Sequence, residues 1–79
     1  MNLRAQNLML FIQLAEGIDD ETWLYHLRSG EYYRWFRKAI KDDDLADKAE
    51  EVERRGGLTA TESREQIKSL IEERYTAPA

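Results

Sequence analysis

The sequence predicts an all-α protein, folded as a compact orthogonal bundle of four to five helices. Apolar residues recur three and four positions apart through most of the chain, which is the spacing of a helix face turned to a core. β-branched residues are few and never alternate with polar residues over the length of a strand. The only proline is Pro78, near the C-terminal end. We expect a single domain over residues 1–75 and a flexible C-terminal tail over residues 76–79.

The first predicted helix covers residues 3–15, with Gly17 as its stop signal. Its apolar residues are numerous: one face carries Leu3, Leu10, Phe11 and Leu14, and it is widened by Leu8, Ile12 and Ala15. An apolar stripe as broad as this indicates contacts on two sides of the helix.

The second predicted helix begins at Asp19, whose carboxylate can accept hydrogen bonds from the free amides of the first turn. Ile18, before this cap, and Trp23, four positions inside the helix, have the spacing of a hydrophobic staple. We expect the helix to end at Ser29-Gly30.

The third predicted helix follows almost without a connection and has two different faces. The face expected in the core carries Tyr32, Trp35, Phe36, Ala39 and Ile40. The other face carries Arg34, Arg37, Lys38 and Lys41. The rings, Trp35 included, are therefore expected to be buried, and the cations to be exposed.

The fourth predicted helix covers about residues 43–55, is capped by Asp42 or Asp43 and is stopped by Gly56-Gly57. Its apolar stripe is narrow and consists of Leu45, Ala49 and Val52. A narrow stripe predicts packing on one side only.

The fifth predicted helix opens with Thr59 and Glu62, which have the spacing of a capping box. It is expected to bury Ile67, Leu70 and Ile71, with Tyr75 closing its end.

The composition excludes several kinds of site. The chain has no cysteine and a single histidine, His26, so it can form no disulfide or thiolate metal site, and zinc would have too few imidazole ligands. The run from Asp42 to Asp44 leads into a helix and lacks the central glycine of a calcium-binding loop. We predict that the protein holds no metal and no cofactor.

No enzymatic activity is predicted either. Asp19, His26 and Ser29 can share one side of the second helix, but nothing near Ser29 resembles a nucleophile elbow. A triad also requires a preorganised set of amide donors. A small hydrolase or accessory catalytic domain stays open as a third class of function.

The chain is expected to be cytoplasmic and not to engage a membrane. Its longest apolar stretch, "LMLFIQLA" over residues 8–15, is too short to span a bilayer and is interrupted by Gln13. The net charge of −4 argues against nucleic acid as a partner, because nucleic-acid binders depend on a basic surface.

The charge is distributed in two blocks. Residues 22–41 carry five cations and one anion, and residues 42–53 carry seven anions and one cation. Two readings stay open: the basic face of the third helix pairs with the acidic fourth helix or a partner protein, or it binds an external anion. The candidate binding residues are Tyr25, His26, Arg28, Tyr33, Arg34, Arg37 and Lys38.

The segment "ETWLYHLRSGEYYRWFRKAIKDDDLA", residues 21–46, resembles a small helical domain family of unknown function found in bacterial and archaeal proteins. The resemblance is carried by Tyr25, His26, Arg28, Gly30, Trp35 and Leu45. Glu31 and Tyr33 depart from the pattern, since aspartate and a small hydroxyl residue are common there. The resemblance implies a short module, sometimes attached to hydrolases or sugar-metabolism enzymes, and it implies no activity of its own.

We therefore expect a non-enzymatic interaction or regulatory module, of which an accessory to a metabolic enzyme is one form. Its partner would be another protein or further copies of itself. The alternative is a binder of an anionic ligand, either a phosphorylated metabolite or nucleic acid, through the basic face of the third helix.

Overall fold

The computed structural model describes residues 3–75 and confirms the all-helical bundle for this part of the chain. Its elements are α1 (Leu3–Gly17), α2 (Asp20–Arg28), α3 (Glu31–Trp35), η1 (Phe36–Ile40), α4 (Asp43–Arg54) and α5 (Ala60–Tyr75). η1 is a π-helical turn that continues α3 without a break. The tail predicted over residues 76–79 lies outside the described residues.

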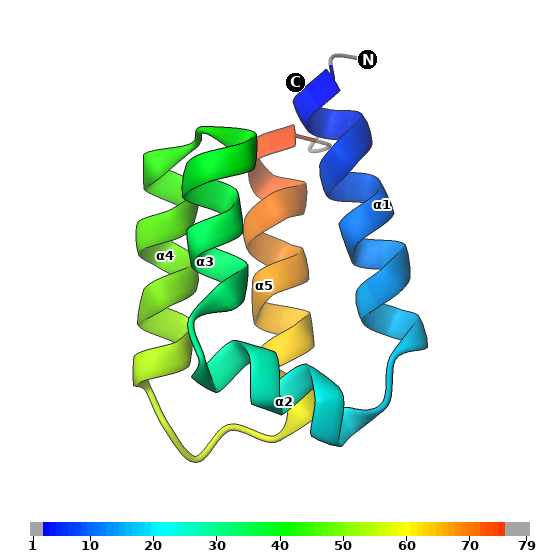
Figure 1. The fold of residues 1–79 in the computed structure, drawn as a ribbon, viewed down its shortest axis with the longest axis vertical. Helices are drawn as coiled ribbons and strands as arrows, with labels where there is room; N and C mark the ends of the chain where they lie inside the picture. The colour runs from blue at the N-terminus through cyan, green and yellow to red at the C-terminus, as the bar shows by residue number, and fades with distance from the viewer. Residues whose placement is uncertain (1–2, 76–79) are drawn as a thin grey trace.

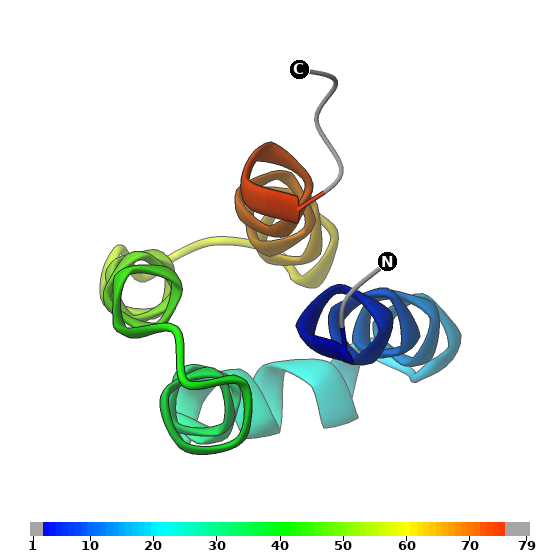
Figure 2. The same ribbon diagram turned by 90° about the horizontal axis from the view of Figure 1, so that it is seen from above.

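The longer elements surround a common core. α1, the continuous unit of α3 and η1, α4 and α5 run along the long axis of the molecule, whereas α2 lies across one end (Figure 1). Seen from above, α4 and α1 lie on opposite sides of the core, with α5 between them on one flank (Figure 2). The crossing of the predicted orthogonal bundle is thus made by α2.

Large side chains from every long element meet in the interior. Those that are almost completely inaccessible to solvent are Leu8, Trp23, Phe36, Ile40, Leu45, Ile67 and Ile71. Ser63 is buried among them, and its Oγ accepts a hydrogen bond of 2.8 Å from the indole Nε1 of Trp23. The same hydroxyl donates to the carbonyl of Ala60 at 3.0 Å. The buried polar groups of this contact are therefore paired, as burial requires.

The predicted helix caps are present. The Asp19 carboxylate accepts from the Thr22 amide at 3.0 Å, and its hydrogen bonds with the Thr22 side chain and backbone lower the pKa of Asp19. Of the two candidates at the start of α4, Asp42 is the cap, accepting from the Leu45 amide at 3.0 Å. Local sequence signals thus locate the helix starts correctly.

Thr59 and Glu62 form the predicted capping box at the start of α5. The Glu62 amide donates to the Thr59 hydroxyl at 3.1 Å, and the Thr59 amide donates to the Glu62 carboxylate at 3.0 Å. Farther along α5, Ile67 and Ile71 are buried as predicted, and Leu70 is partly buried.

The main face predicted for α1 is wrong at three of its four residues, since only Phe11 packs against the core. The core side of α1 carries Leu8 and Ala15, which are buried. Leu3, Leu10 and Leu14 are 71%, 56% and 68% exposed. α1 packs against α5 and η1, and its Phe11 contacts rings of α2 and α3. The three exposed leucines lie beyond these contacts, so the wide apolar stripe extends past the core to the outer surface.

The predicted burial of Trp35 is also wrong. Trp35 is 37% exposed, and its ring stacks on Phe11 with centroids 5.6 Å apart at the edge of the core. Ala39 is exposed, whereas Phe36 and Ile40 are buried. The π-helical turn of η1 is wider than an α-helical turn, so Ala39 is displaced around the axis relative to the spacing used for the prediction. Trp35 itself precedes this turn and lies at the edge of the bundle, where its ring contacts Phe11 and Phe36.

Phe36→Ala should therefore cost more stability than Trp35→Ala, which reverses the order expected from residue size. We expect a loss of about 3–5 kcal/mol for Phe36→Ala, because the ring is fully buried. For Trp35→Ala we expect about 1–2 kcal/mol, mainly from lost stacking. Urea unfolding of both variants measures the difference, and equal losses would show that Trp35 belongs to the core.

The turn between α2 and α3 depends on Gly30. This residue is buried and has a φ of +74°, a conformation that other residues adopt at a cost. A Cβ atom at position 30 would lie 2.8 Å from the ring of Tyr33. Gly30 therefore provides both the left-handed turn and the space in which the Tyr33 ring lies.

Gly30→Ala should destabilise the protein by about 1 kcal/mol or more beyond Gly57→Ala. Gly57 is the matched control, since its φ is +68° but a Cβ there would meet no atom within 4 Å. In a Tyr33→Ala background the two glycine substitutions should cost the same, because the steric conflict is gone. Thermal unfolding of the double-mutant cycle tests this, and an extra cost that persists without the ring would contradict it.

Candidate functional site

Part of the predicted basic surface is engaged within the molecule. Arg37 forms an ion pair of 2.6 Å with Asp47 and lies 3.9 Å from Asp43. Arg34 donates to the backbone carbonyl of Ser29. Both guanidinium groups lie 5.9 Å from the centroid of the Tyr33 ring. Tyr33 is thus half-buried between two arginines, which leaves little of its ring for a ligand to stack on.

The other predicted binding residues are spread over the surface. Tyr25 is 66% exposed and shares an open hollow with Arg28. Lys38 is exposed, and within residues 3–75 it has no ion-pair partner. The His26 ring packs edge-on against Tyr25 with centroids 5.2 Å apart, and its Nδ1 contacts the Glu31 carboxylate. The structure therefore brings some of the predicted residues together in pairs and does not assemble the whole set into one pocket.

The side chains considered for a catalytic triad have separate partners. Asp19 caps α2, and the Ser29 hydroxyl donates to the Tyr25 carbonyl at 2.9 Å. His26 pairs with Glu31. No cluster of three potential metal ligands occurs among the described residues, and none of their helices is long and apolar enough to cross a membrane.

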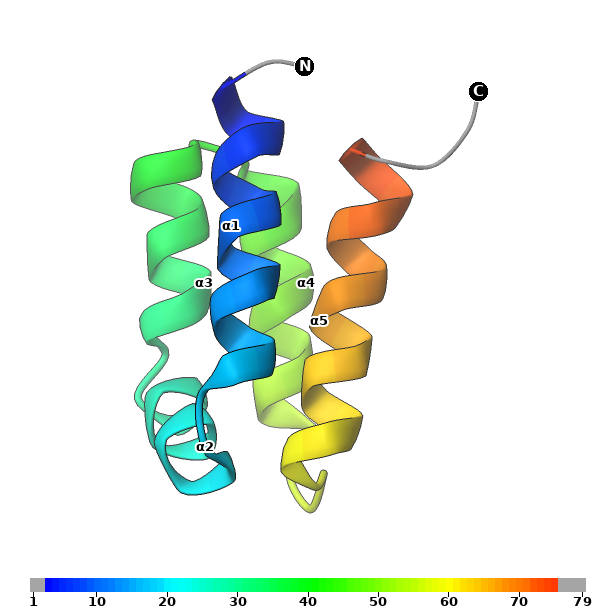
Figure 3. The same cartoon turned by 90° about the vertical axis from the view of Figure 1, so that its right-hand side faces the viewer.

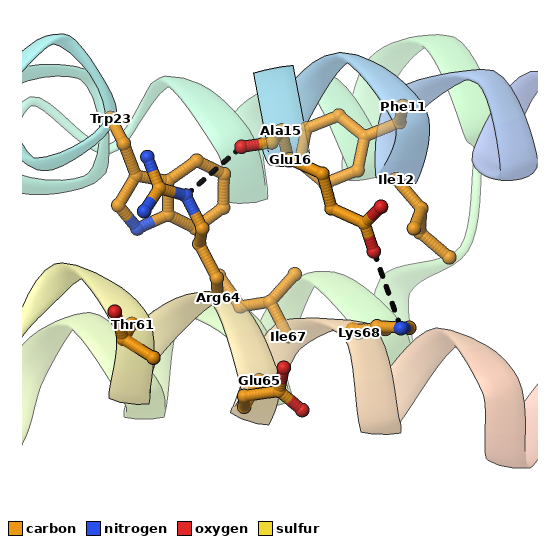
Figure 4. Close-up of a pocket in the computed structure, with 10 residues that line it drawn as sticks. All are labelled: Phe11, Ile12, Ala15, Glu16, Trp23, Thr61, Arg64, Glu65, Ile67 and Lys68. Carbon is orange, nitrogen blue, oxygen red and sulfur yellow. Dashed lines mark hydrogen bonds and ion pairs between the residues drawn. The ribbon is translucent and has the colours of Figure 1, made fainter. Parts of the chain in front are cut away.

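A small pocket of about 190 Å³ lies between α1 and α5, and Arg64 is one of the residues that line it (Figure 4). The Arg64 guanidinium lies over the Trp23 ring, with 5.5 Å between its central carbon and the ring centroid. Arg64 donates to the carbonyls of Ala15 and Ile18 at 2.9 and 2.7 Å, and it pairs with Asp20 at 2.6 Å. This side chain thus satisfies carbonyl groups at the C-terminal end of α1.

The second cation of this pocket is also paired. Lys68 contacts the Glu16 carboxylate at 3.2 Å across the opening between the two helices (Figure 4). The hydrogen bond and charge of Glu16 raise the pKa of Lys68. Because Arg64 and Lys68 both bind groups of α1, we assign the pocket to the joint between α1 and α5.

A second concavity is larger and mainly apolar. This groove, about 540 Å³, lies between α1 and the unit of α2 and α3. Its lining consists of Asn7, Leu10, Phe11, Leu14, His26, Glu31, Tyr32 and Trp35. Leu10, Leu14 and Trp35 are exposed to solvent here, and His26 with Glu31 provides the polar part of the lining. We refer to this feature as the apolar groove.

The floor of the apolar groove is aromatic and uncharged. The Tyr32 ring stacks on Trp23 with centroids 4.3 Å apart, and its hydroxyl donates to the Trp23 carbonyl at 3.1 Å. Burial, together with the nearby charge of Glu31, raises the pKa of Tyr32 to about 12. Tyr32 is therefore neutral at physiological pH. Phe11 packs edge-on against it at 5.5 Å.

Of the residues proposed from the sequence, only His26 lines the apolar groove. Leu10 and Leu14 were assigned to the main face of a core helix, and Trp35 to the core. The signal that could have found them is the width of the apolar stripe on α1, which already indicated contacts on two sides.

Comparisons with protein-family models, with curated proteins and with solved structures find no match to this chain. The resemblance of residues 21–46 to a small helical domain family stays a prediction.

One further cluster of titratable side chains joins the ends of η1 and α5. Asp42 is 5% exposed and accepts hydrogen bonds of 2.9 and 3.0 Å from the Arg74 guanidinium, besides one from the Tyr75 hydroxyl. Burial raises the pKa of Asp42, but these bonds and the Leu45 amide outweigh burial and hold it below the ordinary value. Asp42 therefore serves as helix cap and as anchor for the end of α5.

Asp42→Asn should lower the free energy of unfolding by about 1–3 kcal/mol at pH 7. A lowered pKa means that the ionised carboxylate stabilises the fold above its unfolded pKa of 3.8, and that this contribution is lost as the pH falls through the folded pKa. The difference from wild type should thus shrink below pH 3.8. Urea unfolding at several pH values measures it.

Asp47→Asn is the matched control, because Asp47 forms an exposed ion pair with Arg37. It should cost about 0–1 kcal/mol. A similar loss for both variants would contradict the special role of Asp42.

Proposed function

We propose that this chain is a non-enzymatic helical interaction module and that the apolar groove is its binding surface. The observation that carries the proposal is the exposure of Leu10, Leu14 and Trp35 beside one another, at 56%, 68% and 37%. In a chain this small, large apolar side chains are needed for the core. A contiguous group of them outside the core is the usual mark of a surface that binds another protein.

The shape and chemistry of the groove suit the apolar face of a helix. Leu10 and Leu14 are one helical turn apart, and the Phe11 and Trp35 rings extend the apolar surface away from α1. An amphipathic helix bound here would contact these residues through side chains at similar spacing. Burying one leucine completely contributes about 1.5–3 kcal/mol, so a few such contacts support specific binding.

The polar part of the groove can orient a partner. His26 and Glu31 pair with each other at one side of the groove, and both are partly exposed. They can exchange hydrogen bonds with polar groups of a bound segment while the apolar residues provide most of the affinity. A regulatory or accessory role, including attachment to a metabolic enzyme in the cytoplasm, is the setting that we propose for this binding.

Binding of an anionic ligand is the second candidate. It is favoured by Arg28 and Lys38, which are exposed and have no ion-pair partner within residues 3–75. Against it stand the pairing of Arg37 with Asp47 and the net charge of −4. The two candidates use different residues and can be tested together.

Wild type, a groove variant (Leu10→Gln with Leu14→Gln) and a basic-surface variant (Arg28→Gln with Lys38→Gln) should be immobilised and exposed to a lysate of the source cells. We expect wild type and the basic-surface variant to retain the same proteins and the groove variant to lose them. Quantitative mass spectrometry measures retention, and circular dichroism verifies that each variant is helical.

The same three proteins should be titrated with single-stranded RNA and with inorganic pyrophosphate at low and physiological salt. Salt-sensitive binding that is lost in the basic-surface variant would support the anionic ligand instead. Identical protein retention by all three would contradict the groove as a binding surface.

A further inference from the structure

We infer that the partner of the outer face of α1 is a second copy of this chain, bound as a parallel, two-fold symmetric pair of α1 helices. The inference rests on the proposed function, because both assign binding to the apolar side chains of α1 beside the groove. It adds the identity of the partner and the orientation in which it binds.

The outer face of α1 has the residue spacing of a two-helix seam. Leu3, Asn7, Leu10 and Leu14 are separated by four, three and four residues, the spacing of alternating d and a positions in a heptad. The three leucines are exposed and Asn7 is partly exposed. The buried Leu8 lies on the other side of the helix. α1 therefore has one apolar side for its own core and a second side with the pattern of a helix partner.

Within residues 3–75, no other helix covers this second side. Figure 3 shows α1 in front of the bundle, with α3, α4 and α5 behind it. The three leucines and Trp35 expose roughly 400 Å² of side chain, a patch size that is often functional on monomers. Two copies facing each other would bury about 800 Å² in total through these side chains, less than a typical stable interface, so we expect a weak and reversible dimer.

The charges favour a second copy over a charged partner. α1 has only two charged residues, Arg4 and Glu16, near its two ends, although 35% of the whole chain is charged. Glu16 already pairs with Lys68. The positions around the seam include the neutral Gln6 and Gln13. Two copies that each carry a net charge of −4 can thus approach through α1 without bringing carboxylates of the two copies together at the seam.

The helix is formed before association. Leu8 anchors α1 in the core, and Arg64 binds the carbonyls of Ala15 and Ile18 near its C-terminal end. Isolated helices of this length are marginal in water. Because the bundle holds α1 in its helical form, the dimer does not have to supply the free energy of helix formation.

Asn7 favours the parallel over the antiparallel orientation of the two α1 helices. In a parallel pair in register, Asn7 faces Asn7 of the other copy, and the two amides can hydrogen-bond to each other. In the antiparallel pair that overlaps the two stripes fully, Asn7 faces Leu10 and its amide lacks a partner in the seam. A single asparagine at an a position selects register and helix number at a cost in affinity.

Sedimentation equilibrium of wild type should show a monomer–dimer equilibrium at high protein concentration. The Leu10→Gln, Leu14→Gln variant should weaken association about tenfold or more, because each leucine is transferred back to water. Asn7→Leu should strengthen it. Tyr25→Ser is the control, since Tyr25 is 66% exposed but lies on α2, and it should leave association unchanged.

Cysteine cross-linking tests the orientation in a chain that has no cysteine of its own. Asn7→Cys and Ser69→Cys, the second on the exposed side of α5, should be incubated with oxidised glutathione, which accepts the two electrons as two thiols join. We expect a covalent dimer of Asn7→Cys only, since disulfides require Cα atoms within about 7 Å.

Equal cross-linking of both variants, or a dimer unaffected by the two leucine substitutions, would overturn the inference. Wild type that stays monomeric at millimolar concentration would overturn it too. If the monomer still retained other proteins through Leu10 and Leu14, the interaction module would stand and only the identity of its partner would be wrong.

Discussion

The fold depends on the burial of Trp23, which connects the crossing helix α2 to the rest of the bundle. Its indole donates to Ser63 of α5, its ring stacks on Tyr32 of α3, and Phe11 of α1 packs beside it. The cation of Arg64 lies over the same ring. One side chain thus contacts three other helices. Without it, α2 would have only Leu27 as a buried residue.

Two of the concavities of the molecule, the pocket between α1 and α5 and the apolar groove, are built around this side chain. The Trp23 ring forms one wall of the pocket between α1 and α5. In this pocket Arg64 and Lys68 bind groups of α1. The apolar groove is floored by Phe11 and Tyr32, which pack on Trp23. The polar pocket is therefore part of the scaffold. The apolar groove, whose aromatic floor has no further apolar layer above it among the described residues, is the surface that we propose for a partner.

The two faces of α1 follow from the size of the chain. A domain of 79 residues has a large surface for its volume, and its core takes up only a narrow side of each helix. Leu8 and Ala15 occupy that side of α1. Leu10 and Leu14 lie beyond it, so their exposure costs the monomer no core packing and keeps an apolar surface available for association.

The sequence by itself determined the helices and their starts. Asp19, Asp42 and the pair of Thr59 and Glu62 cap helices through contacts three residues apart, and such contacts can be read from spacing. The ion pair of Arg37 with Asp47 could be predicted for a similar reason, because two adjoining segments of the chain carry opposite charge.

Only the tertiary structure decided which apolar face of α1 is buried, that Trp35 lies at the surface, and that Asp42 binds Arg74. Residues 42 and 74 are far apart in sequence, so the spacing of neighbouring residues cannot predict that they are in contact. Helical periodicity places the leucines of α1 on faces, but it does not say where the neighbouring helices lie. The π-helical turn at η1 further changes the register after Trp35. The candidate site consists of what the core leaves uncovered, so it could be located only once the packing of all the helices was known.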